Sequence, residues 1–137
     1  MHSKKASTMY LLLTCVSLLL LNPTVSFSQA TDIGGQLYLG SCAKCHGREG
    51  EGFLKLYPPI RNSHYLKEDV SKLPCIIANG LKGKITIEGQ TFNQIMPAIQ
   101  SLKPDQINEI ILYMQHKWNH PVTELSVSKW LEDCDTK

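Results

Sequence analysis

Apolar residues recur at helical spacing in the last third of the chain. They stand at i, i+3, i+4 and i+7, on one face of a helix: Ile107, Ile110, Ile111 and Met114. Pro104 fits the first helical position, and Asp105 lies in the first turn, where the helix dipole favours a carboxylate. We therefore expect a helix from Pro104 toward Trp118, ended by Asn119 and Pro121.

Two further helices are expected upstream, and no segment shows sustained strand alternation. Thr31 or Asp32 can cap the first helix. A second covers Leu66–Ala78, with Asn79-Gly80 as its stop. Ile85-Thr86-Ile87 is predicted to be at most a short extended piece within a loop. The pattern thus predicts an all-α fold of three or more helices.

The N-terminal segment has the layout of a secretory signal peptide. Lys4 and Lys5 precede an apolar run of 13 residues, Met9–Leu21, and small residues at Ser28 and Ala30 suit a signal peptidase. The alternative is an uncleaved membrane anchor, but a membrane span needs roughly 20 apolar residues. We predict that residues 1–30 are cleaved and that the protein is periplasmic or otherwise exported.

Composition limits the remaining possibilities. The chain has 137 residues, of which 42% are hydrophobic, so it holds one domain and is not globally disordered. Its 14 basic and 12 acidic residues give a net charge of +2, which excludes a strongly basic nucleic-acid binder. We predict a domain at 31–120 and a C-terminal extension at 121–137, in which Thr123–Asp133 forms a short helix.

Cys42-Ala43-Lys44-Cys45-His46 is a C-x-x-C-H motif, which is typical of c-type haem attachment. Two thiols three positions apart can form thioether bonds with the two vinyl groups of one haem, and the next imidazole can bind the iron. The alternatives are a thioredoxin-like redox pair, half of a zinc site and a plain disulfide. No second ligand pair supports zinc, and the flanks do not resemble a βαβ unit.

The iron of such a haem needs a sixth ligand or an open face. Met96 lies in a predicted loop before Pro97, and a methionine thioether is a soft ligand suited to haem iron. The alternative is that Met96 only fills the core, which is what we expect of Met114. His64, His116 and His120 are competing ligands.

The chain from about Asp32 to Trp118 resembles the class I mono-haem cytochrome c family, and in particular its small bacterial periplasmic members. The matching residues stand in the family's order: Gly34, Gly35, Tyr38, the motif Cys42–His46, Gly47, Gly50-Glu51-Gly52, Tyr57-Pro58-Pro59-Ile60, Asn79-Gly80, Gly89–Asn93 and Met96-Pro97. The resemblance implies the helical cytochrome c fold around one covalently bound haem c, and one-electron transfer.

The resemblance also implies roles for individual residues. Gly34 would let the first helix cross the last one closely, and Tyr38 would pack there against Ile110 and Tyr113. A carbonyl of the Pro58-Pro59 segment would accept a hydrogen bond from the imidazole of the haem motif and fix its orientation. The alternative for that segment is simply a rigid turn.

Cys75 and Cys134 are not required by the family pattern. In an oxidising compartment an intramolecular Cys75–Cys134 disulfide is the simplest expectation, and it would pin residues 121–137 onto the haem domain. The alternatives are a buried free Cys75 and an intermolecular bond through Cys134.

These features predict a monomeric periplasmic electron carrier rather than an enzyme. With His46 and Met96 both bound to the iron, no position is left for a small-molecule substrate. Redox partner proteins would dock transiently, and five lysines could steer an acidic partner: Lys44, Lys55, Lys82, Lys84 and Lys103. The alternatives are a haem c subunit of a dehydrogenase or terminal oxidase complex, and a haem sensor with a labile Met96.

Overall fold

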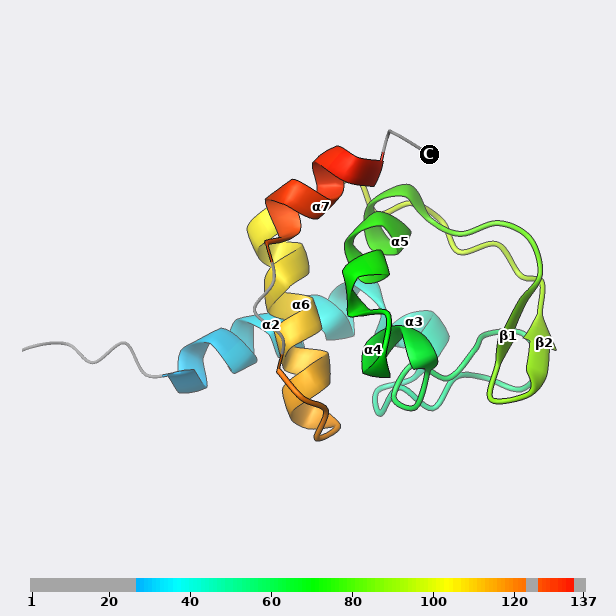
Figure 1. Ribbon diagram of the computed structural model, residues 1–137. Helices are drawn as coiled ribbons and strands as arrows, with labels where there is room; N and C mark the ends of the chain where they lie inside the picture. The colour runs from blue at the N-terminus through cyan, green and yellow to red at the C-terminus, as the bar shows by residue number, and fades with distance from the viewer. Residues whose placement is uncertain (1–26, 123–125, 135–137) are drawn as a thin grey trace, which may run out of the picture.

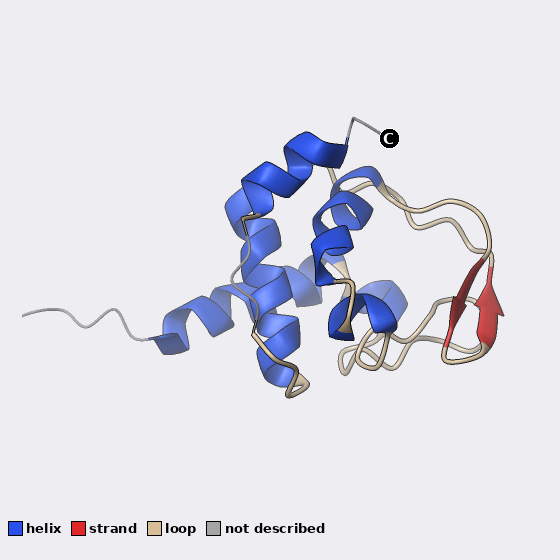
Figure 2. Cartoon of the chain, viewed as in Figure 1, coloured by secondary structure: helices blue, strands red, loops and turns tan. Residues whose placement is uncertain are grey.

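A computed structural model describes residues 27–122 and 126–134, and helices make up most of its regular structure (Figure 2). The elements, in chain order, are α2 (Phe27–Ser41), α3 (Ala43–His46), α4 (His64–Lys67), a 3₁₀ turn (Val70–Lys72), α5 (Leu73–Asn79), β1 (Ile85–Ile87), β2 (Gln90–Phe92), α6 (Pro104–Lys117) and α7 (Val127–Asp133). Residues 1–26 of the predicted signal segment lie outside the described residues. Within the described part, no helix combines the length and apolarity that crossing a membrane requires.

Helices α2 and α6 cross at the centre of the molecule (Figure 1). Their close approach depends on Gly34, because a Cβ atom there would collide with the Glu109 carbonyl oxygen and the Tyr113 Cβ. Tyr38 is fully buried at the crossing, with its ring centroid 5.7 Å from that of Tyr113, and it shares the core with Ile110. The predicted crossing at Gly34 and Tyr38 is confirmed.

Helix α6 is the predicted amphipathic helix. It begins at Pro104 and ends at Lys117, and Trp118 is its C-terminal cap. The Lys103 backbone N–H donates to Gln106 Oε1 at 2.9 Å, which satisfies a donor at the open end of the helix. The predicted stripe is buried, with exposures of 0–2%: Ile107, Ile110, Ile111 and Met114.

Two predicted helix boundaries are wrong. The first helix begins at Phe27, so Thr31 and Asp32 lie inside α2; a capping residue only favours a helix start, and the residues before it here continue the helix. The predicted helix Leu66–Ala78 is divided into α4, the 3₁₀ turn and α5. Pro74 explains the last division, because a residue without an N–H fits only the first turn of a helix, and α5 begins at Leu73.

The prediction of an all-α fold is also incomplete, because β1 and β2 form an antiparallel hairpin. Ile85 pairs with Phe92 and Ile87 with Gln90. The turn between them has left-handed backbone at Glu88 (φ 50°) and Gly89 (φ 78°), the conformation that two-residue hairpin turns require. The hairpin lies at the opposite end of the molecule from the start of α2 (Figure 1).

The C-terminal extension packs back onto the domain as α7, across α5 and α6 (Figure 1). Val127 is 4% exposed and joins the hydrophobic core. The Cys75–Cys134 disulfide is present, with Cα atoms 5.5 Å apart, so this prediction is confirmed. The predicted helix Thr123–Asp133 is shorter at its start, and residues 123–125 lie outside the described part.

Candidate functional site

The C-x-x-C-H motif forms a single helical turn that faces a cavity. Cys42 caps α3, and its carbonyl accepts a hydrogen bond from the His46 backbone N–H at 3.0 Å. Cys42, Cys45 and His46 all line the cavity, and neither thiol forms a disulfide. Burial, and secondarily the nearby Cys45, raises the pKa of Cys42 to about 11. Two free thiols and one imidazole are thus presented to the same space.

The imidazole of His46 is held by its backbone-facing nitrogen. The N–H at His46 Nδ1 donates a hydrogen bond to the Pro58 carbonyl oxygen at 2.9 Å, which leaves Nε2 with a free lone pair. Burial lowers the pKa of His46, and the hydrogen bond to Pro58 opposes that shift. Burial thus favours the neutral ring, which is the form that binds a metal. Pro59 lines the cavity but does not supply this carbonyl.

Met96 reaches the same cavity from the loop after β2. Its backbone is joined to Leu81 by two hydrogen bonds of 3.0 Å, one in each direction. Gly80 permits this approach with φ at 74°, because a Cβ there would collide with the Met96 carbonyl oxygen. The loop carrying the candidate sulfur ligand is therefore fixed to the end of α5.

The rest of the cavity wall is largely apolar and comes from several elements. Met114 of the α6 stripe belongs to it as well as to the core. Sequence reasoning missed other lining residues, which come from α5, the hairpin and the segments around α4: Tyr57, Ser63, Tyr65, Leu73, Ile76, Ile77, Ile85 and Ile87. Ile85 and Ile87 alternate with the exposed Thr86, but an alternation over three residues is too short to assign an inward face from the sequence.

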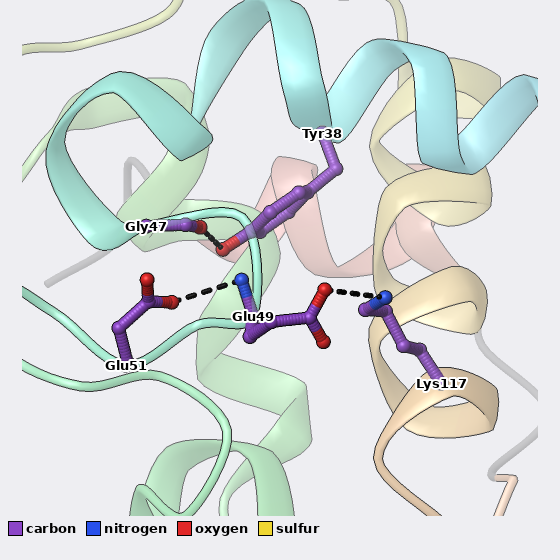
Figure 3. Close-up of polar contacts among 5 residues, drawn as sticks. All are labelled: Tyr38, Gly47, Glu49, Glu51 and Lys117. Atoms are coloured by element: carbon purple, nitrogen blue, oxygen red, sulfur yellow. Dashed lines mark hydrogen bonds and ion pairs between the residues drawn. The ribbon is translucent and has the colours of Figure 1, made fainter.

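The segment that follows His46 is fastened to both crossing helices (Figure 3). Tyr38 Oη donates to the Gly47 carbonyl oxygen at 2.7 Å, and burial raises the pKa of Tyr38, so the phenol keeps its proton. Lys117 Nζ lies 3.2 Å from Glu49 Oε1, and the Glu49 backbone N–H donates to Glu51 Oε2 at 2.8 Å. These contacts hold the C-terminal side of the haem motif in place.

The competing histidines are not brought to the cavity. Among the described lining residues His46 is the one histidine, and His64, His116 and His120 are absent. His120 Nε2 pairs instead with the Arg61 carbonyl oxygen at 2.7 Å, and His64 stacks on Tyr65. In the part of the chain that the structure describes, no group of three or more His, Cys, Asp or Glu side chains could hold a zinc ion.

The residues around the cavity fit a haem. Two free thiols, an imidazole with a free nitrogen and the thioethers of Met96 and Met114 line one largely apolar cavity, and c-type haem binding uses donors of these kinds. The donor atoms come from the haem motif, the Met96 loop and α6, and the apolar wall suits a porphyrin face.

Comparison with known proteins agrees with this fit. The model of the family described as Cytochrome c matches residues 31–118, and the chain belongs to the cytochrome c family. It is similar to cytochrome c-552 of Thermus thermophilus, with 26% identity over 91 residues that cover 62% of this chain and 67% of the relative. Cytochrome c-552 from a further strain of Thermus thermophilus is 27% identical over 91 residues, or 60% of its length. Membership of this family implies covalently bound haem c.

Proposed function

We propose that the protein is an exported mono-haem cytochrome c that carries single electrons between partner proteins. One haem c would be attached through Cys42 and Cys45, with His46 and Met96 as the axial iron ligands. The observation that carries the proposal is that these four side chains line one cavity, while the second imidazole nitrogen of His46 is held by Pro58. The haem iron supplies reversible exchange between the ferric and ferrous states.

The chain's own groups prepare this site in three ways. The hydrogen bond from His46 Nδ1 to Pro58 fixes the tautomer and directs Nε2 into the cavity. The two hydrogen bonds between Leu81 and Met96 hold the thioether on the cavity wall. The apolar lining excludes water, which, together with histidine and methionine ligation, favours a raised reduction potential. With His46 and Met96 both holding the iron, no position would remain for a substrate, so we propose a carrier and not an enzyme.

Partner docking is proposed at the cavity side of the molecule. Lys44 lies between the two thiols in sequence, and Lys82 and Lys84 flank the lining residue Gly83. All three lysines are exposed, and the salt bridges found among the described residues involve other lysines. They would steer an acidic redox partner into a small and transient interface.

A second candidate is a haem c subunit held permanently by a larger redox complex. The loop beside the lining residue Tyr57 exposes three large apolar side chains: Phe53 at 56%, Leu54 at 76% and Leu56 at 49%. Such a patch is suited to a lasting interface. Co-purification with a partner at a fixed ratio through size-exclusion chromatography would favour the subunit, and a monomeric elution would favour the free carrier.

An optical spectrum of the purified, exported protein tests the main proposal. A sharp ferrous α-band indicates thioether-linked haem, and a weak far-red band in the ferric form indicates methionine sulfur on the iron. Intact mass should show one added haem and a chain beginning after residue 30, because the cleaved segment, the domain at 31–120 and the extension are part of the proposal. A mass without a macrocycle, from a host that matures cytochromes, would overturn it.

A further inference from the structure

The disulfide joins the C-terminal extension to the element that carries the Met96 loop. Cys75 lies in the middle of α5, and Cys134 directly follows α7. Leu73, Ile76 and Ile77 of α5 line the cavity, whereas Cys75 does not. Helical spacing places Cys75 on the opposite face from Leu73 and Ile77. The bridge therefore holds α5 from the side that faces away from the cavity.

Helix α5 has little stability of its own. It has seven residues and no side-chain hydrogen bond at its N-terminal cap. A helix of this length is not stable in isolation, because one or two turns do not offset the cost of nucleation. Its position depends on its packing against α6 and α7 (Figure 1). The disulfide fixes the contact with α7.

The end of α5 in turn holds Met96. The Ile77 carbonyl accepts a hydrogen bond from the Ile99 backbone N–H at 3.0 Å, and Leu81 exchanges two hydrogen bonds of 3.0 Å with Met96. Gly80 lies between Ile77 and Leu81, and its positive φ of 74° brings its backbone against the Met96 carbonyl. One backbone hydrogen bond thus links the Met96 loop to α5 itself, and two more link Met96 to Leu81, two residues beyond the end of the helix.

We propose that Cys75 and Cys134 are positioning residues for the methionine ligand. The disulfide holds α5 against α7, which itself packs on α6, and the chain at the end of α5 holds the backbone of Met96 at the cavity wall. Without the bridge, α5 is free to shift relative to α7, and the loop leaves its position more often. This inference rests on the proposed ligation of iron by Met96, and it assigns to the C-terminal extension a function at the redox centre.

The test compares the wild-type holoprotein with the double variant Cys75→Ser/Cys134→Ser. The variant should bind imidazole to its ferric iron roughly tenfold more tightly at constant pH, because the competing thioether is held less firmly. Its far-red band should disappear on heating well before the far-UV circular dichroism changes. Amide hydrogen exchange at Met96 and Ile99, whose N–H groups make the loop's hydrogen bonds, should accelerate by a similar factor.

Gly34→Ala is the matched control. It adds a Cβ against the Glu109 carbonyl oxygen and the Tyr113 Cβ where α2 crosses α6, and it changes no residue of α5, α7, the Met96 loop or the haem motif. It should lower global stability without changing imidazole affinity or exchange at Met96. Equal effects in both variants would mean that the bridge acts only on overall stability and would overturn the inference.

Two further outcomes are decisive. A far-red band in the double variant that survives heating as it does in the wild type, with the same imidazole affinity, would overturn the positioning role while leaving the proposed function intact. A wild-type protein with haem but no far-red band would overturn both, because no sulfur ligand would exist to position. If the variant does not accumulate, wild-type holoprotein whose bridge is reduced with a phosphine and alkylated after haem attachment gives the same measurements.

Discussion

Met96 is the residue on which the redox properties of the proposed site depend most directly. Its side chain is half-buried at the cavity, while its backbone is fixed to Leu81. Thioether ligation raises the reduction potential, and a filled sixth position keeps small ligands from the iron. The reduction potential of the proposed haem should therefore depend strongly on the Met96 side chain.

We expect Met96→Ala to retain covalent haem but to lose the far-red ferric band. Its reduction potential should fall by on the order of 0.1 V, because axial ligands adjust haem potentials over a range of about 0.8 V. Its ferrous form should bind carbon monoxide rapidly. Met114→Leu is the control, since this buried residue also lines the cavity and the change conserves volume. If only Met114→Leu loses the band, Met114 and not Met96 is the sulfur ligand.

Gly80 and Gly89 separate backbone strain from steric contact. Both have positive φ, 74° and 78°, so alanine should cost about 1–2 kcal/mol of conformational strain at either position. At Gly80 the new Cβ would also lie 2.8 Å from the Ala98 nitrogen, whereas at Gly89, which does not line the cavity, nothing lies within 4 Å. Only Gly80→Ala should weaken the far-red band. Urea unfolding and the ferric spectrum measure the two effects, and equal band loss in both variants would contradict this account.

At the scale of the elements, the crossing of α2 and α6 makes the clearest prediction. Gly34→Ala should destabilise the protein by several kcal/mol, on the order of an overpacked core, because the Cβ meets helix backbone that cannot rotate away. Gly40→Ala, in the same helix, has open space around it and should stabilise by about 0.5–1 kcal/mol. Thermal unfolding of the two holoproteins checks the pair. Similar stability of both variants would show that the helices do not approach as closely as described.

The sequence predicts elements well where one local pattern decides them. The apolar stripe of α6 and its start at Pro104 follow from helical periodicity and proline geometry alone. The division of Leu66–Ala78 and the pairing of β1 with β2 depend on tertiary packing, which overrides weak local preference. A strand of three residues is too short for its alternation to be distinguished from a loop.

The candidate site divides in the same way. The spacing of Cys42, Cys45 and His46 is local and therefore visible in the sequence. Met96 can also be identified, because methionine usually fills the core and one in a predicted loop favours a ligand. That Pro58, and not Pro59, supplies the carbonyl to His46 depends on how the chain turns back after Gly52. The apolar wall from α5 and the hairpin likewise required the fold.

At the scale of the whole molecule, the cavity separates two parts of the protein that differ in how much their order depends on the haem. On one side, α2 and α7 each pack on α6, and the disulfide joins α7 to α5. On the other side, the hairpin and the Met96 loop face mainly the cavity through Ile85, Ile87 and Met96. That second part has few partners other than the group that fills the cavity, so its order should depend on the haem.

We therefore expect Cys42→Ala/Cys45→Ala, which cannot attach haem covalently, to lose cooperative folding. A domain of this size has about 5–15 kcal/mol of stability, and an unfilled apolar cavity at its centre removes much of the burial that supplies it. Far-UV circular dichroism should show reduced helix and a broad thermal transition, while dye binding reports exposed apolar surface. The residual helix should come from α2 and α6, so amide exchange should stay slowest around Tyr38 and Ile110 and become fast in β1 and β2. An undiminished, cooperative helical transition in this variant would mean that the polypeptide packs its own core and that the cavity is not shaped by a prosthetic group.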